Sequence, residues 1–156
     1  MSEKHIAYVA LGSNLGDREA NLRRALELLA GHGAEICAVS SFIETEPYGV
    51  TDQPGFLNGA CMVRTELEPE KLLRLLLDIE REMGRLRLRR WGERNIDLDL
   101  ILYEDRVINT EELKLPHPDM QNRDFVLLPM AELAPEAVHP LLGRTMAQLK
   151  EELLKR

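Results

Sequence analysis

The chain is poor in aromatic side chains: one Trp, three Tyr and three Phe among 156 residues. Sheets that read RNA stack bases on several aromatic rings and present a basic surface. Basic residues are also too few for this, because 20 Lys and Arg stand against 27 Asp and Glu and give a formal net charge of −7. The composition therefore disfavours a general nucleic-acid binder.

Cysteines and long apolar runs are equally scarce. The two cysteines, Cys37 and Cys61, have no metal-ligand spacing and no secretory cleavage pattern precedes them, so we expect reduced, buried thiols. No stretch approaches the roughly 20 apolar residues that a membrane span requires. With 44% hydrophobic and 30% charged residues, the sequence predicts a cytoplasmic protein with a single domain over residues 1–156.

Hydrophobic spacing and chain-breaking residues predict the element order β-α-β-β-α-β, followed by a tail. The predicted strands cover residues 5–11, 34–45, 56–66 and 95–103, and the predicted helices cover about 18–30 and 69–83. The tail has a short strand at 107–108, a helical piece at 124–133 and a last helix opened by a capping box at Thr145. This order is the signature of a ferredoxin-like α+β sandwich, an antiparallel sheet with helices on one face, here with a C-terminal helical extension.

Two acids in the fourth predicted strand are the most informative feature. Alternate side chains of a strand point to opposite faces, so Asp97 and Asp99 share one face with Cβ atoms about 6–7 Å apart. We expect the helix-covered face of the same strand to carry Ile96, Leu98, Leu100 and Leu102. Paired carboxylates suit Mg²⁺ held jointly with substrate phosphates, although a solvated strand face with two incidental acids fits the Asp-x-Asp pattern equally well.

The segment just before this strand favours the metal-site interpretation. Residues 81–94 contain six arginines against two glutamates, in a chain that is acidic overall. Guanidinium groups bind phosphate oxygens through two parallel hydrogen bonds, so arginines near a carboxylate pair suit phosphoryl transfer. A solvated basic turn is the alternative, and it is less favoured because Trp91, the one tryptophan, lies within the segment.

Three weaker features complete the pattern. The glycine loop at residues 12–16 follows a strand and precedes a helix, but it lacks the Gly-Lys-Ser/Thr of a P-loop and is expected to be a structural turn. His117 stands between two prolines, where it can donate a hydrogen bond to a phosphate or be incidental. Phe56 and Phe125 lie at loop boundaries, where two rings can enclose a flat heterocycle, although core packing is the default interpretation.

Seven stretches in a fixed order carry a family resemblance over roughly residues 6–140. They are residues 10–16 (ALGSNLG), 40–47 (SSFIETEP), 52–58 (DQPGFLN), 84–87 (GRLR), 90–94 (RWGER), 97–99 (DLD), and 115–118 (LPHP) together with 122–123 (NR). With these stretches the chain resembles the 6-hydroxymethyl-7,8-dihydropterin pyrophosphokinase family of folate biosynthesis. One departure is Glu93, which stands where the family usually has proline.

The resemblance implies an ATP-dependent diphosphotransferase. It implies that a diphosphoryl group passes from ATP to the pterin hydroxymethyl oxygen, with release of AMP. It also implies that Asp97 and Asp99 bind two Mg²⁺ ions that bridge the ATP phosphates. The expected partners are ATP and the pterin alone, with no nucleic acid or membrane, and the expected assembly is a monomer.

The same resemblance implies roles for the remaining site residues. Phe56 and Phe125 sandwich the pterin, while Asn58 reads its polar edge with help from Thr45 and the backbone near Tyr48. The nucleotide side is lined by Glu80, Arg87, Leu100, His117 and Arg123. The catalytic group consists of Arg85 and Arg94, which stabilise charge on the transferring group, and Trp91, which helps to close the loop.

A non-catalytic ferredoxin-like module that binds a small molecule or RNA is the alternative function. Such a module has no need for Asp97 and Asp99 together with six arginines. Formation of AMP from ATP, Mg²⁺ and hydroxymethyl-dihydropterin distinguishes the two hypotheses in a single assay.

Overall fold

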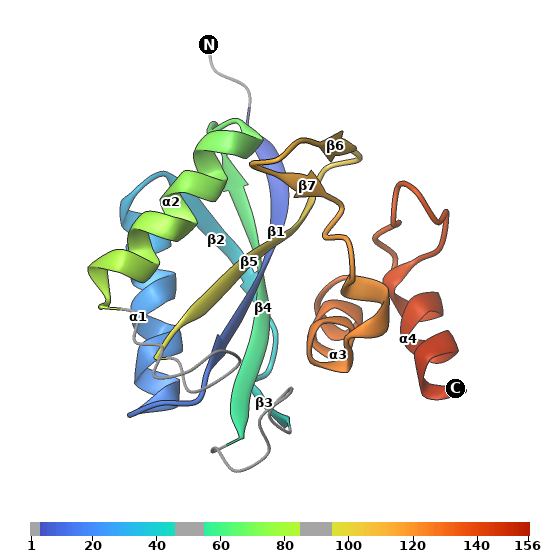
Figure 1. Ribbon diagram of the computed structural model, residues 1–156, viewed down its shortest axis with the longest axis horizontal. Helices are drawn as coiled ribbons and strands as arrows, with labels where there is room; N and C mark the ends of the chain where they lie inside the picture. The colour runs from blue at the N-terminus through green and yellow to red at the C-terminus, as the bar shows by residue number, and fades with distance from the viewer. Residues whose placement is uncertain (1–3, 46–54, 85–94) are drawn as a thin grey trace.

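The fold is built on one antiparallel sheet. A computed structural model describes residues 4–45, 55–84 and 95–156, and its main strands run in the order β2-β4-β1-β5, with β3 also paired to β4 (Figure 1). The strands are β1 (His5–Ser13), β2 (Ala34–Val39), β3 (Ile43–Thr45), β4 (Phe56–Thr65) and β5 (Asp97–Tyr103). Every neighbouring pair is antiparallel, which confirms the predicted α+β class with an antiparallel sheet.

Two helices, α1 (Arg18–Gly31) and α2 (Pro69–Glu82), cover one face of this sheet (Figure 1). The Asp17 carboxylate caps α1 by accepting a hydrogen bond from the Ala20 backbone N–H at 3.1 Å. In α2, Pro69 occupies the first turn, where its missing N–H costs no hydrogen bond. Leu72, Leu76 and Ile79 recur at helical spacing and are buried against the sheet.

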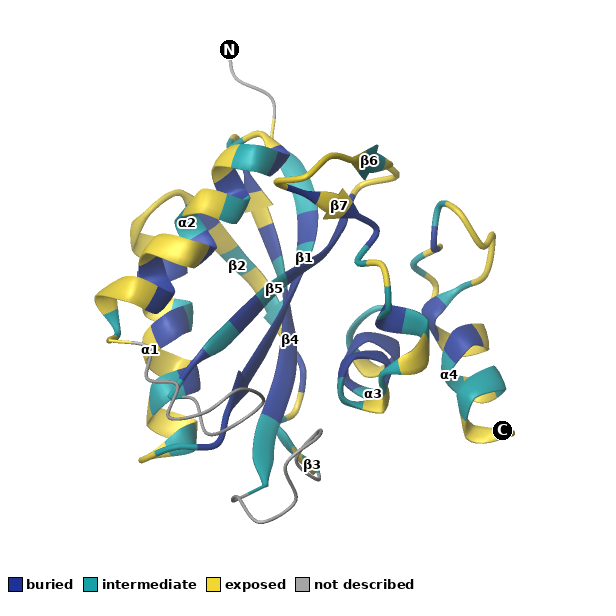
Figure 2. Ribbon diagram, in the orientation of Figure 1, coloured by how far each residue is buried: buried dark blue, intermediate teal, exposed yellow. Residues whose placement is uncertain are grey.

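The C-terminal extension covers the opposite face, so the expectation of helices on one face only was incomplete (Figures 1 and 2). It consists of the hairpin β6 (Ile108–Asn109) and β7 (Lys114–Leu115), the short 3-10 helix η1 (Met120–Asn122), α3 (Asp124–Leu133) and α4 (Met146–Leu154). Val126, Leu127 and Met130 of α3 pack with Ala10 and Ala60 of the sheet. The small alanines allow α3 to approach closely, and strands covered on both faces lose simple hydrophobic alternation.

A β-bulge in β5 moves Leu102 away from its predicted side. Leu98 and Leu100 belong to the core under α1 and α2, as predicted, but Leu102 packs in the core under α3. Consecutive residues Tyr8 and Val9 of β1 pair with Leu102 and Leu100. Ile101 is therefore the extra residue, and it reverses the side-chain alternation beyond it.

The strand predicted over residues 34–45 is interrupted. It ends as β2 at Val39, and β3 begins at Ile43. Between them the Ser40 hydroxyl accepts a hydrogen bond from the Ala60 N–H at 2.9 Å. The Glu132 carboxylate of α3 accepts hydrogen bonds from the Ser41 N–H at 2.7 Å and the Ser41 hydroxyl at 2.9 Å. Side chains thus satisfy backbone N–H groups where the ladder breaks.

Other local predictions have mixed outcomes. The capping box at Thr145 is present, with reciprocal bonds between Thr145 and Gln148. Both cysteines are free, but only Cys61 is buried, and its burial raises the thiol pKa to about 12; the expectation that Cys37 is buried was wrong. Within the described residues, no helix is long and apolar enough to cross a membrane.

Candidate active site

The two strand acids lie side by side on the sheet face that α3 also covers. In the β1–β5 ladder Asp97 is opposite Gly12, and Asp99 is opposite Ala10. Directly paired residues of an antiparallel sheet point to the same face, so both carboxylates lie on the face of Ala10, which packs with α3. Both acids are half-buried. The prediction that Asp97 and Asp99 share one face is confirmed.

Asn58 extends the same row across the sheet. Gly12 is paired with Asn58 of β4 on one side and with Asp97 of β5 on the other. A Cβ atom at Gly12 would lie only 2.7 Å from the Asn58 Oδ1, so a larger residue would displace the Asn58 side chain. The buried Asn58 amide therefore lies over Gly12, between β4 and the acidic strand.

Thr45 and Phe56 flank Asn58 on the same face. Thr45 of β3 is paired with Phe56 of β4, and Asn58 is two residues further along β4. The Asn58 Nδ2 donates a hydrogen bond to the Thr45 Oγ1. The pair fixes the orientation of the Asn58 amide, which leaves the Oδ1 edge near Gly12.

Phe125 enters this face from α3. The Arg123 guanidinium lies 5.6 Å from the centroid of the Phe125 ring, a cation–π distance. The half-buried Phe125 ring packs at the margin of the core under α3. Within the described part of the chain the aromatic ring contact is between His5 and Tyr103, so Phe56 and Phe125 do not stack directly on each other.

Glu80 fixes the backbone of β5 between the two acids. Its carboxylate on α2 is buried and accepts a hydrogen bond from the Leu98 N–H at 2.8 Å. Leu98 is the residue between Asp97 and Asp99, so this bond fixes the backbone that carries both carboxylates. Without Glu80 this buried N–H at the edge of β5 would lose its acceptor.

A pocket of about 340 Å³ opens along this edge of β5. Five predicted site residues are among those that line it, namely Glu80, Asp97, Asp99, Leu100 and His117. Its other walls come from Leu73 and Leu77 of α2 and from residues 112–114. Glu112 and Lys114 had not been predicted as pocket residues, because Glu112 lies between the strands of the hairpin and the two-residue strand β7 is too short to give a periodic signal. The pocket therefore combines an apolar wall with carboxylates and a histidine.

His117 is held in a neutral state at this pocket. Burial, and then the charge of Arg123, lower the His117 pKa from 6.5 to about 4, and Asp119 opposes them only in part. The His117 Nδ1 accepts a long hydrogen bond of 3.4 Å from the Asp119 N–H. The proton of the neutral ring is thereby placed on Nε2, where it can serve as a donor.

Arg123 lies beside the pocket rather than in its lining. Its Nε donates to the Asp119 Oδ2 at 3.4 Å, while its guanidinium also faces the Phe125 ring. Arg123 is thus held between the two groups and connects the His117 loop to the start of α3.

Five predicted site residues lie outside the described residues: Tyr48, Arg85, Arg87, Trp91 and Arg94. So does Glu93. Asn95, which had not been predicted as a site residue, is the first described residue after positions 85–94. Its Nδ2 donates to the Met83 carbonyl at 2.7 Å and to the Gly84 carbonyl at 3.3 Å. The residues on either side of positions 85–94 are therefore held together just before β5.

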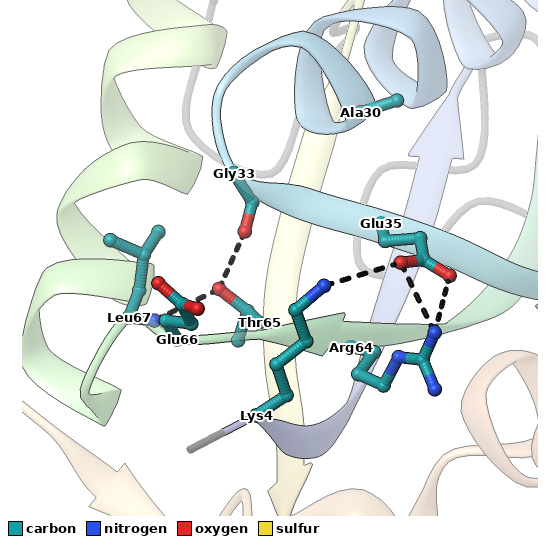
Figure 3. Close-up of a pocket in the computed structure, with 8 residues that line it drawn as sticks. All are labelled: Lys4, Ala30, Gly33, Glu35, Arg64, Thr65, Glu66 and Leu67. Atoms are coloured by element: carbon teal, nitrogen blue, oxygen red, sulfur yellow. Dashed lines mark hydrogen bonds and ion pairs between the residues drawn. The ribbon is translucent and has the colours of Figure 1, made fainter. Parts of the chain in front are cut away.

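A second pocket, of about 420 Å³, lies at the opposite end of the strands (Figure 3). Lys4 and Arg64 both pair with Glu35, at 3.7 and 3.0 Å. The Thr65 hydroxyl donates to the Gly33 carbonyl at 2.7 Å and accepts from the Leu67 N–H. These groups are engaged with one another, and the candidate site residues are at the other end of β1.

The sheet order, the helix layers on both faces and the acid-bearing edge strand define a ferredoxin-like α+β protein with a carboxylate-lined site. A family model described as 7,8-dihydro-6-hydroxymethylpterin-pyrophosphokinase (HPPK) matches residues 8–135. The chain belongs to this family.

Curated relatives agree with the family match. The chain is 52% identical to 2-amino-4-hydroxy-6-hydroxymethyldihydropteridine pyrophosphokinase of Bacillus subtilis over 130 residues, which cover 83% of this chain and 78% of the relative. It is 44% identical to the protein of the same name from Haemophilus influenzae over 150 residues, covering 96% of this chain and 91% of the relative.

Solved structures support the fold. A Plasmodium falciparum HPPK-DHPS triple mutant with SDX-DHP superposes with a TM-score of 0.80 and covers 99% of this chain. The sequence identity is 19%, and this chain spans only 45% of the length of that one. The match is therefore evidence for the fold of the region that the two proteins share.

Proposed function

We propose that this chain transfers the diphosphoryl group of ATP to the hydroxymethyl oxygen of 6-hydroxymethyl-7,8-dihydropterin and releases AMP, a step of folate biosynthesis. Family membership supports this activity over the non-catalytic binding module. The observation that carries the proposal is the row formed by Asn58, Gly12 and Asp97 across three strands. The row places an amide suited to a heterocycle beside carboxylates suited to a metal–phosphate complex.

The donor set at Asp97 and Asp99 fits Mg²⁺. Both are carboxylates, the hard oxygen ligands that Mg²⁺ takes, usually one or two from protein with the rest from water and phosphate. Within the described residues no group of three or more His, Cys, Asp or Glu could hold a metal ion, and we propose that ATP oxygens and water would supply the remaining ligands. Bound there, Mg²⁺ would supply charge neutralisation for the transferring phosphates, and we propose two ions.

We propose that the pterin occupies the face formed by Thr45, Phe56 and Asn58, with Phe125 across from Phe56. The Asn58 amide offers both a donor and an acceptor, which match the polar edge of a pterin. Its bond to Thr45 fixes which way it points. Planar rings on either side bury the heterocycle faces, and these contacts orient the hydroxymethyl oxygen toward the acid pair.

On the nucleotide side, we propose that ATP occupies the pocket lined by Leu100 and His117. The neutral His117 donates its Nε2–H to a phosphate oxygen without a change of charge. Glu80 keeps the backbone at Leu98 in position and thereby orients the two carboxylates. Arg123, held by Asp119, adds positive charge near the phosphates. In-line attack then requires the pterin oxygen and the β-phosphorus to be held together by these groups.

Several finer assignments remain predictions. Arg87 as a nucleotide ligand, Tyr48 at the pterin, and Arg85, Trp91 and Arg94 as catalytic groups rest on the family resemblance. We also propose that residues 1–156 form a single domain, because one sheet is shared by both hydrophobic cores. On the family resemblance we propose that the enzyme is a monomer, and we propose that it works in the cytoplasm, where ATP is abundant.

One assay tests the activity directly. Purified protein is incubated with Mg²⁺, ATP and 6-hydroxymethyl-7,8-dihydropterin, and the nucleotide products are separated by chromatography. We expect AMP and pterin diphosphate in equal amounts, and no AMP when EDTA is added or the pterin is omitted. ADP as the nucleotide product, or no turnover, would overturn the proposal.

A further inference from the structure

Arg18, the first residue of α1, links β3 to the residue before β4 from the sheet face opposite the candidate pterin face. Its Nη1 donates hydrogen bonds to the Glu44 Oε2 at 2.8 Å and to the Gly55 carbonyl at 2.9 Å. Its Nη2 donates to the other Glu44 oxygen, the Oε1. One guanidinium thus makes a two-bond contact with β3 and a third bond to the residue before β4.

The two partners of Arg18 adjoin residues proposed to bind the pterin. Glu44 directly precedes Thr45, and Gly55 directly precedes Phe56, which is the register partner of Thr45. A Cβ atom at Gly55 would lie 2.9 Å from the Thr45 carbonyl oxygen. The backbones therefore approach each other closely at the point where Arg18 holds them.

The effect of this bridge reaches Asn58 through Thr45. The Thr45 hydroxyl accepts the hydrogen bond that orients the Asn58 amide. The turn before α1 is itself fixed, because the Asn21 Nδ2 donates to the Leu15 carbonyl at 2.9 Å and to the Ser13 hydroxyl at 3.2 Å. Arg18 consequently connects a rigid helix start to the strand whose threonine sets the amide.

The bridge contributes little to global stability. The Arg18 and Glu44 side chains are 29% and 61% exposed, and exposed ion pairs stabilise folded proteins only weakly. The hydrogen bond from Arg18 also lowers the pKa of Glu44, so the carboxylate stays ionised in neutral solution. Loss of the bridge should therefore change local geometry more than it changes the unfolding equilibrium.

We propose that Arg18 is a positioning residue for pterin recognition: by bridging Glu44 and Gly55 it holds Thr45, and through Thr45 the Asn58 amide, in the geometry that binds the pterin edge. Arg18 acts through other residues and does not touch the substrate. This inference rests on the proposed function, because it assigns the same face to the pterin.

The first test is the Arg18→Ala variant with separate Michaelis constants for each substrate. We expect the KM for the pterin to rise about tenfold, a change of about 1.4 kcal/mol. The KM for ATP and the melting temperature should change little. Arg24→Ala is the matched control, because Arg24 is also on α1 and makes only an exposed pair with Glu27 at 3.9 Å; it should leave both constants unchanged.

Rescue separates positioning from a general structural role. Glu44→Arg combined with Arg18→Glu restores an ion pair with the charges exchanged, and we expect it to recover part of the pterin affinity that each single variant loses. Arg18→Lys should be intermediate, because lysine cannot form the two-bond fork. Pterin affinity is also measured by fluorescence titration in the presence of a non-hydrolysable ATP analogue.

The outcomes distinguish this proposal from the assigned activity. If the wild-type protein forms no AMP, the proposed function fails. If the wild type is active and Arg18→Ala keeps the pterin KM of Arg24→Ala, the positioning role is overturned. An equal rise of the pterin KM and the ATP KM in Arg18→Ala, together with a lower melting temperature, would also overturn the positioning role, because the effect would then be structural.

Discussion

The Asn58 amide of β4 lies over Gly12 of β1, in the space that a side chain at position 12 would fill. The contact is close, 2.7 Å between the Asn58 Oδ1 and the place of a Cβ atom on Gly12. Gly12 is also the register partner of Asp97. A glycine thus separates the residue proposed to bind the pterin from the carboxylates proposed to bind the metal, and it lets both approach the same point.

Gly12→Ala is expected to weaken pterin binding. The new Cβ would push the Asn58 amide out of place, and loss of one or two hydrogen bonds should raise the pterin Kd by roughly 5- to 100-fold. Calorimetric titration in the presence of an ATP analogue measures this change. Gly31→Ala is the control, since no atom lies within 4 Å of the added Cβ; a similar loss in both variants would contradict the steric argument.

Asp97→Asn and Asp99→Asn are expected to lower kcat by about 10²-fold or more, the scale found when groups that stabilise charge are removed. Neither side chain belongs to the core under α1 and α2 or to the core under α3, so the melting temperature should stay close to that of the wild type. Steady-state AMP formation over a range of Mg²⁺ concentrations provides the measurement.

Asp105→Asn provides the comparison for these two variants. Asp105 is an exposed acid in the turn after β5, so its neutralisation alters net charge by the same amount without touching the site. Retained Mg²⁺-dependent activity in the Asp97 and Asp99 double variant would show that the metal is held elsewhere.

Glu80→Ala is expected to destabilise the protein by about 1–3 kcal/mol, because it leaves the buried Leu98 N–H without its acceptor. Glu80→Gln should cost less, since an amide oxygen can still accept that hydrogen bond. Urea unfolding gives both values, with Glu82→Ala on the exposed side of the same helix as reference. Equal stability of the Ala and Gln variants would argue against the hydrogen bond as the reason for burying Glu80.

His117 predicts a dependence of stability on pH. Its pKa is about 4 in the folded protein, against 6.5 ordinarily, so between these values the unfolded chain binds more protons. The free energy of unfolding should therefore fall as pH decreases from about 6.5 to 4. In His117→Gln, the proton uptake on unfolding in this window should be smaller by up to about one proton.

Unfolding curves at several pH values measure that slope. The buried His139 also has a lowered pKa, but it is present in both proteins and cancels in the comparison. An identical slope in wild type and His117→Gln would mean that His117 titrates alike in the folded and unfolded chain.

The sequence predicted the element order because its signals are local. The N-cap at Asp17, Pro69 in the first turn of α2 and the capping box at Thr145 each depend on a few neighbouring residues. The failures depend on distant partners. The break after Val39 is stabilised by Ala60 and Glu132, which lie far along the chain.

For the candidate site, as for the fold, the sequence predicted the features that depend on neighbouring residues and missed those that depend on distant partners. Alternation correctly placed Asp97 and Asp99 on one face, but it could not foresee the bulge at Ile101, because the register slip arises from pairing with β1. Likewise, the Arg18 bridge to Glu44 spans 26 positions and leaves no periodic trace. Residue spacing cannot reveal a long-range contact between two single side chains, whereas it can reveal a motif whose residues are close together in the sequence.

The outer edge of β5 has a further consequence for solubility. An edge strand offers unpaired backbone groups on which a strand of another molecule can assemble. Here the Glu80 carboxylate accepts a hydrogen bond from the Leu98 N–H, and the backbone N–H of His117 donates one to the Ile101 carbonyl at 3.0 Å. The Glu80 side chain, which lines the proposed nucleotide pocket, thus also protects the strand edge against intermolecular strand addition, so Glu80 variants should be screened for aggregation before any loss of turnover is attributed to chemistry.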